Sequence, residues 1–136
     1  MLRRAAGILA LAGLAGLAAG CGGSADQAGG TVAVGGERIA VAPLVDAHVA
    51  ICEAAARPAI ARELFFDRSH DALHTVARAV ENVDRGQAAE LLQAKERVES
   101  ELGAPPASLP GDLARLAAVY RASLGRLAVS APPCVE

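Results

Sequence analysis

Bulky aromatic side chains are almost absent from this 136-residue chain. It has no tryptophan, a single tyrosine (Tyr120) and two phenylalanines (Phe65 and Phe66), although 53% of its residues are hydrophobic. Much of that hydrophobicity is alanine, so a core built from this chain must be thin and consist mainly of alanine, leucine and valine. The composition suffices for one domain, and we expect the two phenylalanines to be its bulkiest core residues.

The signature motifs of common enzyme classes are also missing. The sequence contains no nucleophile elbow, no cysteine nucleophile with a paired histidine and no C-x-x-C pair. Its glycine pairs do not lie between a strand and a helix in the spacing of a phosphate-binding loop. We therefore expect a protein that is not an enzyme.

A distinctive N-terminus is present. Arg3 and Arg4 precede an apolar run, residues 5–19, that is too short and too rich in glycine and alanine to span a bilayer. This pattern is typical of a signal peptide, which we assign to residues 1–20. The run ends in Leu17-Ala18-Ala19-Gly20-Cys21, which resembles the lipobox of bacterial lipoproteins, with Ala18 where that family usually has leucine.

The lipobox resemblance implies that Cys21 is lipidated and becomes the first residue of the mature protein. Its acyl chains, such as palmitate, would anchor the domain stably at the extracytoplasmic face of the cell membrane. The heavy use of alanine, glycine and arginine suggests a GC-rich actinobacterial genome, and the combination of a lipobox, a short linker and one helical domain with two further cysteines resembles the small exported lipoproteins of actinobacteria. In a Gram-negative host, the absence of Asp after Cys21 would indicate the outer membrane. The alternative is an ordinary signal peptide followed by an unmodified cysteine.

Removal of the signal peptide makes the chain more acidic. The full chain has 13 basic and 15 acidic residues, and without residues 1–20 it keeps 11 basic residues, which gives a net charge of −4. A mildly acidic surface argues against nucleic acid as a partner.

Residues 21–42 combine a spacer with a possible hairpin. Residues 22–30 are small and polar, as in a flexible linker. Two short segments, 31–34 and 38–41, then flank Gly35-Gly36. They predict either a small two-stranded ribbon packed on the helices or an extended linker.

Helical hydrophobic spacing begins after Pro43, and residues 43–136 predict an all-α domain, an up-and-down bundle of about four helices. The expected buried stripes are Leu44, His48, Ile51, Cys52 and Ala55; Leu73, Val76, Ala77, Val80 and Val83; Ala88, Leu91, Val98 and Leu102; and Leu113, Leu116, Ala117, Tyr120, Leu124 and Leu127. We expect a solvated face at Glu90, Lys95, Glu96, Arg97, Glu99 and Glu101.

Helix boundaries follow from proline, glycine and capping residues. Pro58 should end the first helix, and Asp67 should cap a helix over residues 68–83. Asp84 and Gln87 resemble a capping box, for a helix that stops at Gly103. The last helix should begin at Ser108 or Leu109, with Pro110 in its first turn.

Two cysteines remain after Cys21. In an exported protein, Cys52 and Cys134 most simply form a disulfide. In the chain-entropy model, a disulfide that closes so long a loop raises the free energy of unfolding by about 4 to 5 kcal/mol. The alternative is a pair of free thiols for metal or redox chemistry.

The residues that most suggest a specific function are two histidines four positions apart. His70 and His74, at i and i+4, share a helix edge with Asp67 and Glu81, and this spacing suits a zinc or copper ion. His48 and Glu53 are candidates for a further ligand.

A structural role is the alternative for these residues. Asp67 would then cap the helix, and Asp71 would lie favourably at its positive end. The spacing is similar to the H-E-x-x-H of zinc proteases, but Asp71 replaces the glutamate and no third ligand is recognisable.

The sequence therefore predicts a membrane-anchored, non-enzymatic helical domain that binds an unidentified partner or ligand at the cell envelope. A zinc- or copper-binding lipoprotein that uses His70 and His74 is the alternative function.

Overall fold

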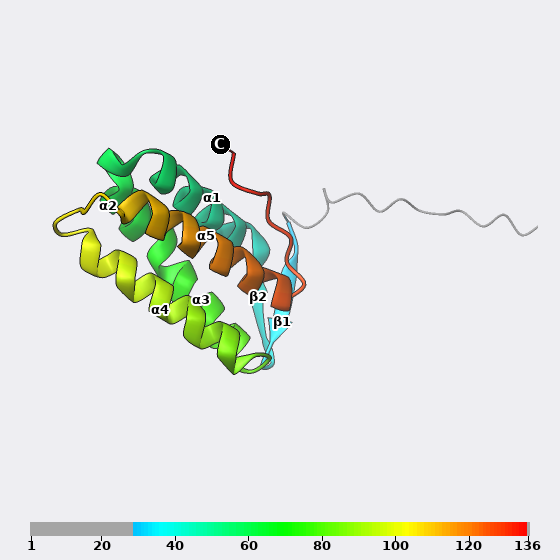
Figure 1. Cartoon of the computed structure of the whole chain (residues 1–136). Coiled ribbons are helices and arrows are strands. Elements are labelled where there is room, and N and C mark those ends of the chain that lie inside the picture. The colour runs from blue at the N-terminus through cyan, green and yellow to red at the C-terminus, as the bar shows by residue number, and fades with distance from the viewer. Residues whose placement is uncertain (1–28, 136) are drawn as a thin grey trace, which may run out of the picture.

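The computed structural model describes residues 29–135. The expected signal peptide, Cys21 and most of the spacer lie outside this range. The elements are β1 (Thr31–Val34), β2 (Glu37–Ala40), α1 (Val41–Ala56), a 3₁₀ turn η2 (Pro58–Ile60), α2 (Ala61–Leu64), a π-helical turn η3 (Phe65–Ser69), α3 (His70–Glu81), α4 (Arg85–Glu101) and α5 (Leu109–Arg126). Within residues 29–135, four long helices preceded by a β-ribbon confirm the expected architecture (Figure 1).

The ribbon is a tight antiparallel hairpin. Gly35 and Gly36 have φ values of +56° and +89°, a left-handed geometry that glycine adopts without strain and that matches the twist of the two strands. Side chains of Val32, Val34 and Ile39 pack against the core. Because β2 leads directly into α1, the alternative of an extended linker over residues 31–40 is wrong.

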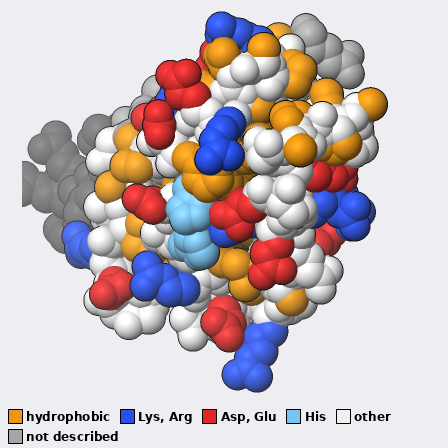
Figure 2. Space-filling view, turned by 90° about the vertical axis from the view of Figure 1, so that its left-hand side faces the viewer, with side chains coloured by type: hydrophobic (Ala, Val, Ile, Leu, Met, Phe, Trp, Pro, Cys, Tyr) orange, Lys and Arg blue, Asp and Glu red, His pale blue; other side chains and the backbone are white. Residues whose placement is uncertain are grey.

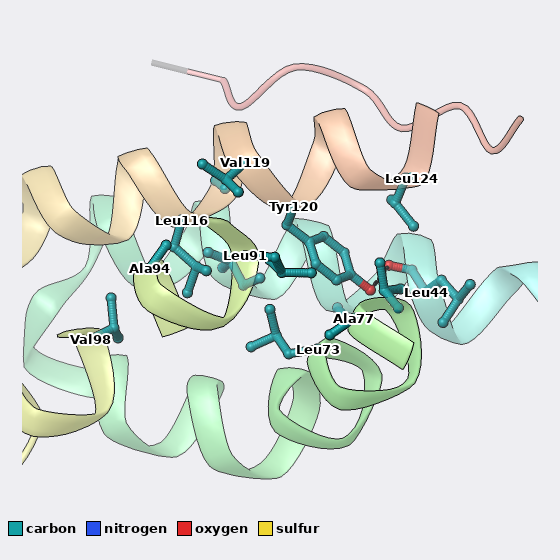
Figure 3. Packing of buried hydrophobic residues seen from close by; sticks show 14 of the residues in the cluster. Leu44, Leu73, Ala77, Leu91, Ala94, Val98, Leu116, Val119, Tyr120 and Leu124 are labelled. Atoms are coloured by element: carbon teal, nitrogen blue, oxygen red, sulfur yellow. Dashed lines mark hydrogen bonds between the residues drawn. The ribbon is translucent and has the colours of Figure 1, made fainter. Parts of the chain in front are cut away.

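The core lies where α5 packs against both α1 and α4 (Figure 3). Tyr120 is the largest fully buried side chain, and Leu73, Leu91, Leu116 and Leu124 surround it with aliphatic carbon. Its hydroxyl donates a hydrogen bond of 3.1 Å to the carbonyl of Leu44. Burial raises the pKa of Tyr120, because the phenolate would lose its hydration.

The expected helix start at Asp67 is wrong. Residues 61–81 form consecutive helical turns, α2, η3 and α3, and Asp67 lies exposed within the π-helical turn. The buried hydroxyl of Ser69 lies 3.3 Å from the Leu64 carbonyl and 3.4 Å from the Ala47 carbonyl, so it ties this turn to α1. A π-helical turn inserts one residue into the helix and so displaces the side chains that follow.

Three expectations about burial are corrected. Phe65 is fully buried, but Phe66 is 41% exposed because the π-helical turn directs only one of the two rings inward. Val83 is 61% exposed, since α3 ends at Glu81 before the stripe reaches it. Lys95, assigned to a solvated face, is only 5% exposed and pairs with Glu99.

Half of the expected capping box is formed. The Asp84 carboxylate accepts a hydrogen bond of 3.0 Å from the Gln87 backbone N–H. The Gln87 side chain reaches α5 instead of closing the box, and it donates to the Ser123 hydroxyl and the Val119 carbonyl. The residue thus joins α4 to α5.

The disulfide between Cys52 and Cys134 is present, with 5.2 Å between the two Cα atoms. Figure 1 shows the C-terminal segment running back along the bundle beside α5 and α1. The Arg121 side chain donates a hydrogen bond of 3.1 Å to the Ala131 carbonyl and helps to hold this segment in place. Within residues 29–135, no helix combines the length and the hydropathy that a membrane-spanning segment needs.

Candidate functional site

The expected histidine pair is assembled on one face of the bundle. His70 and His74 lie one turn apart on α3, with ring centroids 4.8 Å apart and the rings edge to face. Figure 2 shows histidine side chains near the centre of a molecular face, bordered by acidic and basic side chains. The i and i+4 spacing therefore brings the two imidazoles together as expected.

A carboxylate from the facing helix binds one of these histidines. Glu99 Oε1 on α4 lies 2.9 Å from His70 Nε2 and 2.7 Å from Lys95 Nζ, so one oxygen serves both groups. The pKa of His74 is lowered, first by desolvation and then by the positive charge of Lys95. Sequence reasoning missed Glu99, because its spacing along α4 does not indicate which residue of α3 it faces.

The other proposed ligands do not complete a metal site with this pair. Asp67 lies in η3 and lines a separate hollow beside Phe66, whereas Glu81, the last residue of α3, lines a groove together with His74. Glu53 forms ion pairs with Arg57 and Arg68. Within residues 29–135, the two histidines belong to no group of three ligating side chains whose ligand atoms lie within 4.8 Å of one another.

A shallow groove of about 290 Å³ lies between α3 and α4, which we call the α3–α4 groove. Its lining comprises His74, Ala77, Arg78 and Glu81 from α3, and Arg85, Ala88, Ala89 and Leu92 from α4. Ala77, Ala88 and Ala89 have short apolar side chains and leave the groove open. Leu92 adds apolar surface, because 38% of this residue is exposed. The groove thus offers apolar surface inside a charged rim.

Two arginines at the rim of this groove, Arg78 and Arg85, form no ion pair with another residue of the described range. Glu81 lines the same groove and is likewise without an ion pair there. Two guanidinium groups and one carboxylate leave the rim with a positive balance.

A second cluster surrounds the disulfide. His48 is 1% exposed, and its Nδ1 lies 3.8 Å from Cys52 Sγ, while its ring stacks on Tyr120 with centroids 6.3 Å apart. Desolvation lowers the pKa of His48, a hydrogen bond to the Ala117 backbone opposes this shift, and the charge of Arg121 adds to it.

This position does not support the expectation that His48 helps His70 and His74. The four-residue spacing of His48 and Cys52 on one buried stripe is the sequence signal that could have placed the histidine beside the disulfide. His48, Cys52 and Cys134 form the one group of at least three potential metal-ligating residues found within residues 29–135.

Comparison with protein-family models, with curated proteins and with solved structures gives no match to this chain. Its function must therefore be argued from its own residues.

Proposed function

We propose that this protein is a lipid-anchored, extracytoplasmic binding protein without enzymatic activity, and that the α3–α4 groove receives its partner. The observation that carries the proposal is the combination of an exposed Leu92, an alanine lining and two arginines that form no ion pair with any residue of the described range 29–135. Apolar surface that recruits a ligand, framed by polar groups that orient it, is the usual composition of a binding site.

The partner that fits best is a protein segment with an apolar side chain and a nearby carboxylate. At about 290 Å³, the groove lies at the lower limit of small-molecule sites, which span about 300 to 1,000 Å³. This size favours a side chain of a larger partner over a cofactor. Arg78 and Arg85 would bind the carboxylate in bidentate geometry.

The lipobox supports the lipid anchor, and the disulfide supports a location outside the cytoplasm. Disulfides persist in oxidising compartments outside the cytoplasm, where a lipoprotein domain would function. The chain between Cys21 and Thr31 reaches at most about 35 Å when fully extended. A partner would therefore be an envelope protein close to the membrane surface.

Site-specific photo-crosslinking in intact cells tests this proposal. A crosslinking amino acid replaces Leu92 in the full chain, and a matched control carries it at Ala118, an exposed residue of α5 that does not line the groove. We expect one partner crosslinked from position 92 and absent from position 118. Peptide mapping should locate the crosslink beside an acidic residue, and Arg78→Glu with Arg85→Glu should abolish it.

Two outcomes would contradict the proposal. Equal crosslinking from both positions would show that contact is non-specific. A position-92 crosslink that survives the double charge reversal would show that the arginines do not select the partner.

Metal binding by His70 and His74 is the second candidate function, favoured by their rings being 4.8 Å apart. Glu99 replaces Asp67 and Glu81 as the proposed carboxylate, since it already lies 2.9 Å from His70. Lys95 opposes this function, because its ammonium binds the same oxygen and would repel a cation.

Calorimetry distinguishes the two functions. Zn(II) and Cu(II) are titrated into the oxidised full chain carrying Cys21→Ser, and into the same chain with His70→Ala and His74→Ala. Stoichiometric binding that the double variant loses would establish the metal site. Equal heats from the two folded proteins would eliminate it.

A further inference from the structure

We propose that reduction of the Cys52–Cys134 disulfide turns it, together with His48, into a binding site for a thiophilic metal ion such as Zn(II). The three potential ligand atoms, one from each residue, already lie within 4.8 Å of one another. This site is independent of the α3–α4 groove and of the His70/His74 pair.

The donor set changes when the disulfide is reduced. Bonded to each other, the two sulfurs are not thiolates and offer little to a metal ion. A dithiol reductant transfers two electrons and two protons: the S–S bond breaks, Cys52 and Cys134 become thiols, and the reductant becomes a disulfide. Binding Zn(II) then releases both thiol protons to solvent and leaves two thiolates and one imidazole, a donor set that zinc prefers.

The positions require little movement. Zn–S bonds of about 2.3 Å and Zn–N bonds of about 2.0 Å in tetrahedral geometry separate nitrogen from sulfur by about 3.5 Å. His48 Nδ1 and Cys52 Sγ already lie 3.8 Å apart. The two sulfurs must separate to about 3.8 Å. Cys134 can supply this change, because it is exposed and residues 129–135 belong to no helix or strand.

The ring of His48 lies close to the cysteines. Its Nδ1 and Nε2 lie 3.8 and 3.9 Å from Cys52 Sγ, so either nitrogen is near enough to share an ion with that sulfur. Stacking on Tyr120 fixes the plane of the ring.

The three ligands range from buried to exposed. His48 is buried, Cys52 is partly buried and Cys134 is exposed, so an ion approaches from the side of the C-terminal segment. In this arrangement, oxidation of the two thiolates to the disulfide removes two of the three ligands. The metal would therefore be bound in the reduced protein and released on oxidation.

Zn(II) titration of the reduced full chain tests this site. All chains carry Cys21→Ser, which leaves Cys52 and Cys134 as the only thiols, and tris(2-carboxyethyl)phosphine is the reductant. Affinity is measured by competition with a chromophoric chelator, with Co(II) absorption as a second reading of thiolate ligation. The site variants are Cys134→Ser and His48→Gln, and the matched control is His70→Ala with His74→Ala, which leaves the three ligands intact.

We expect the reduced chain and the control to bind one Zn(II) each and the oxidised chain to bind none at this site. Cys134→Ser should weaken binding by more than the 10- to 100-fold that loss of an outer hydrogen bond causes, and His48→Gln should do the same. Zn(II) should also raise the Tm of the reduced chain, or restore its helical circular dichroism if reduction unfolds it.

The proposal is overturned if Cys134→Ser or His48→Gln binds Zn(II) as tightly as the reduced parent. It is also overturned if Zn(II) neither raises the Tm nor restores the fold of the reduced chain. Neither result would bear on partner binding in the α3–α4 groove, which crosslinking of the oxidised protein measures separately.

Discussion

The hydroxyl of Tyr120 on α5 donates a hydrogen bond of 3.1 Å to the carbonyl of Leu44 on α1. This bond joins the last helix to the first at the centre of a core that has few large side chains. We expect Tyr120→Phe to lower the free energy of unfolding by about 1 kcal/mol, because only the hydrogen bond is lost. Tyr120→Ala should cost about 3 to 5 kcal/mol, because it also leaves a cavity. Urea denaturation of the three proteins measures both values. Equal losses of unfolding free energy in the two variants would show that Tyr120 stabilises the fold through its hydroxyl and not through its ring.

The disulfide should contribute a large share of the stability. Cys52 and Cys134 are 82 residues apart in sequence, and the chain-entropy model assigns about 4 to 5 kcal/mol to a loop of that length. We expect the Cys52→Ser/Cys134→Ser variant to unfold at a markedly lower urea concentration than the oxidised protein. A chelator is included in these measurements so that no metal stabilises the reduced parent. Addition of reductant should destabilise only the parent, and an unchanged midpoint would contradict the prediction.

Buried His48 should make the fold sensitive to mild acid. Its pKa in the folded state lies below the ordinary value of 6.5, chiefly because of desolvation, so the unfolded chain binds a proton more readily. The free energy of unfolding should therefore fall as the pH drops through 6.5, and level off below the folded pKa. Its slope for one group is at most about 1.4 kcal/mol per pH unit.

Two variants distinguish the contributions of His48 and His74, whose pKa values are both lowered in the folded state. His48→Gln should remove its part of the slope between about pH 7.5 and the folded pKa. His74→Gln should have a smaller effect, because His74 is exposed whereas His48 is buried. Urea titrations at several pH values measure these slopes, and an unchanged slope in His48→Gln would refute the assignment.

Loss of the Glu99 carboxylate should lower the free energy of unfolding more than loss of the Lys95 ammonium. Lys95 is 5% exposed and Glu99 Oε1 is 2.7 Å from its ammonium, so Glu99→Gln leaves a buried cation with weaker compensation. We expect a cost of about 1 to 3 kcal/mol for Glu99→Gln. Lys95→Met should cost under about 1 kcal/mol, since methionine fills the space and Glu99 keeps His70 and water. Thermal unfolding of both variants measures this order, and the reverse order would contradict it.

Helix periodicity predicted most of the core, because each inward stripe depends only on local spacing. The α5 stripe through Leu113, Leu116, Tyr120 and Leu124 is buried as predicted. The hairpin at Gly35-Gly36 and the cap at Asp84 are local as well. Such features are specified by a few neighbouring residues.

The errors arise where distant elements decide the local structure. The π-helical turn moves Phe66 outward and places Asp67 inside a helix, and Ser69 holds this turn through a contact with α1. Burial of Lys95 depends on where α3 packs against α4. The same packing of α3 against α4 places Glu99 beside His70. The sequence therefore predicted only half of the candidate site: the spacing of His70 and His74 is local to one helix, whereas the contact with Glu99 depends on a second helix.

Mass spectrometry of the mature N-terminus tests the lipid anchor, on which the proposed location and partner of this protein depend. The full chain is expressed in a bacterium that processes lipoproteins, beside a Cys21→Ser variant, and both are partitioned between detergent and aqueous phases. We predict a mature chain that begins at Cys21, carries the mass of a diacylglyceryl group and enters the detergent phase, whereas the variant lacks this modification. A wild-type Cys21 that carries a free thiol, in a chain that remains in the aqueous phase, would contradict this prediction.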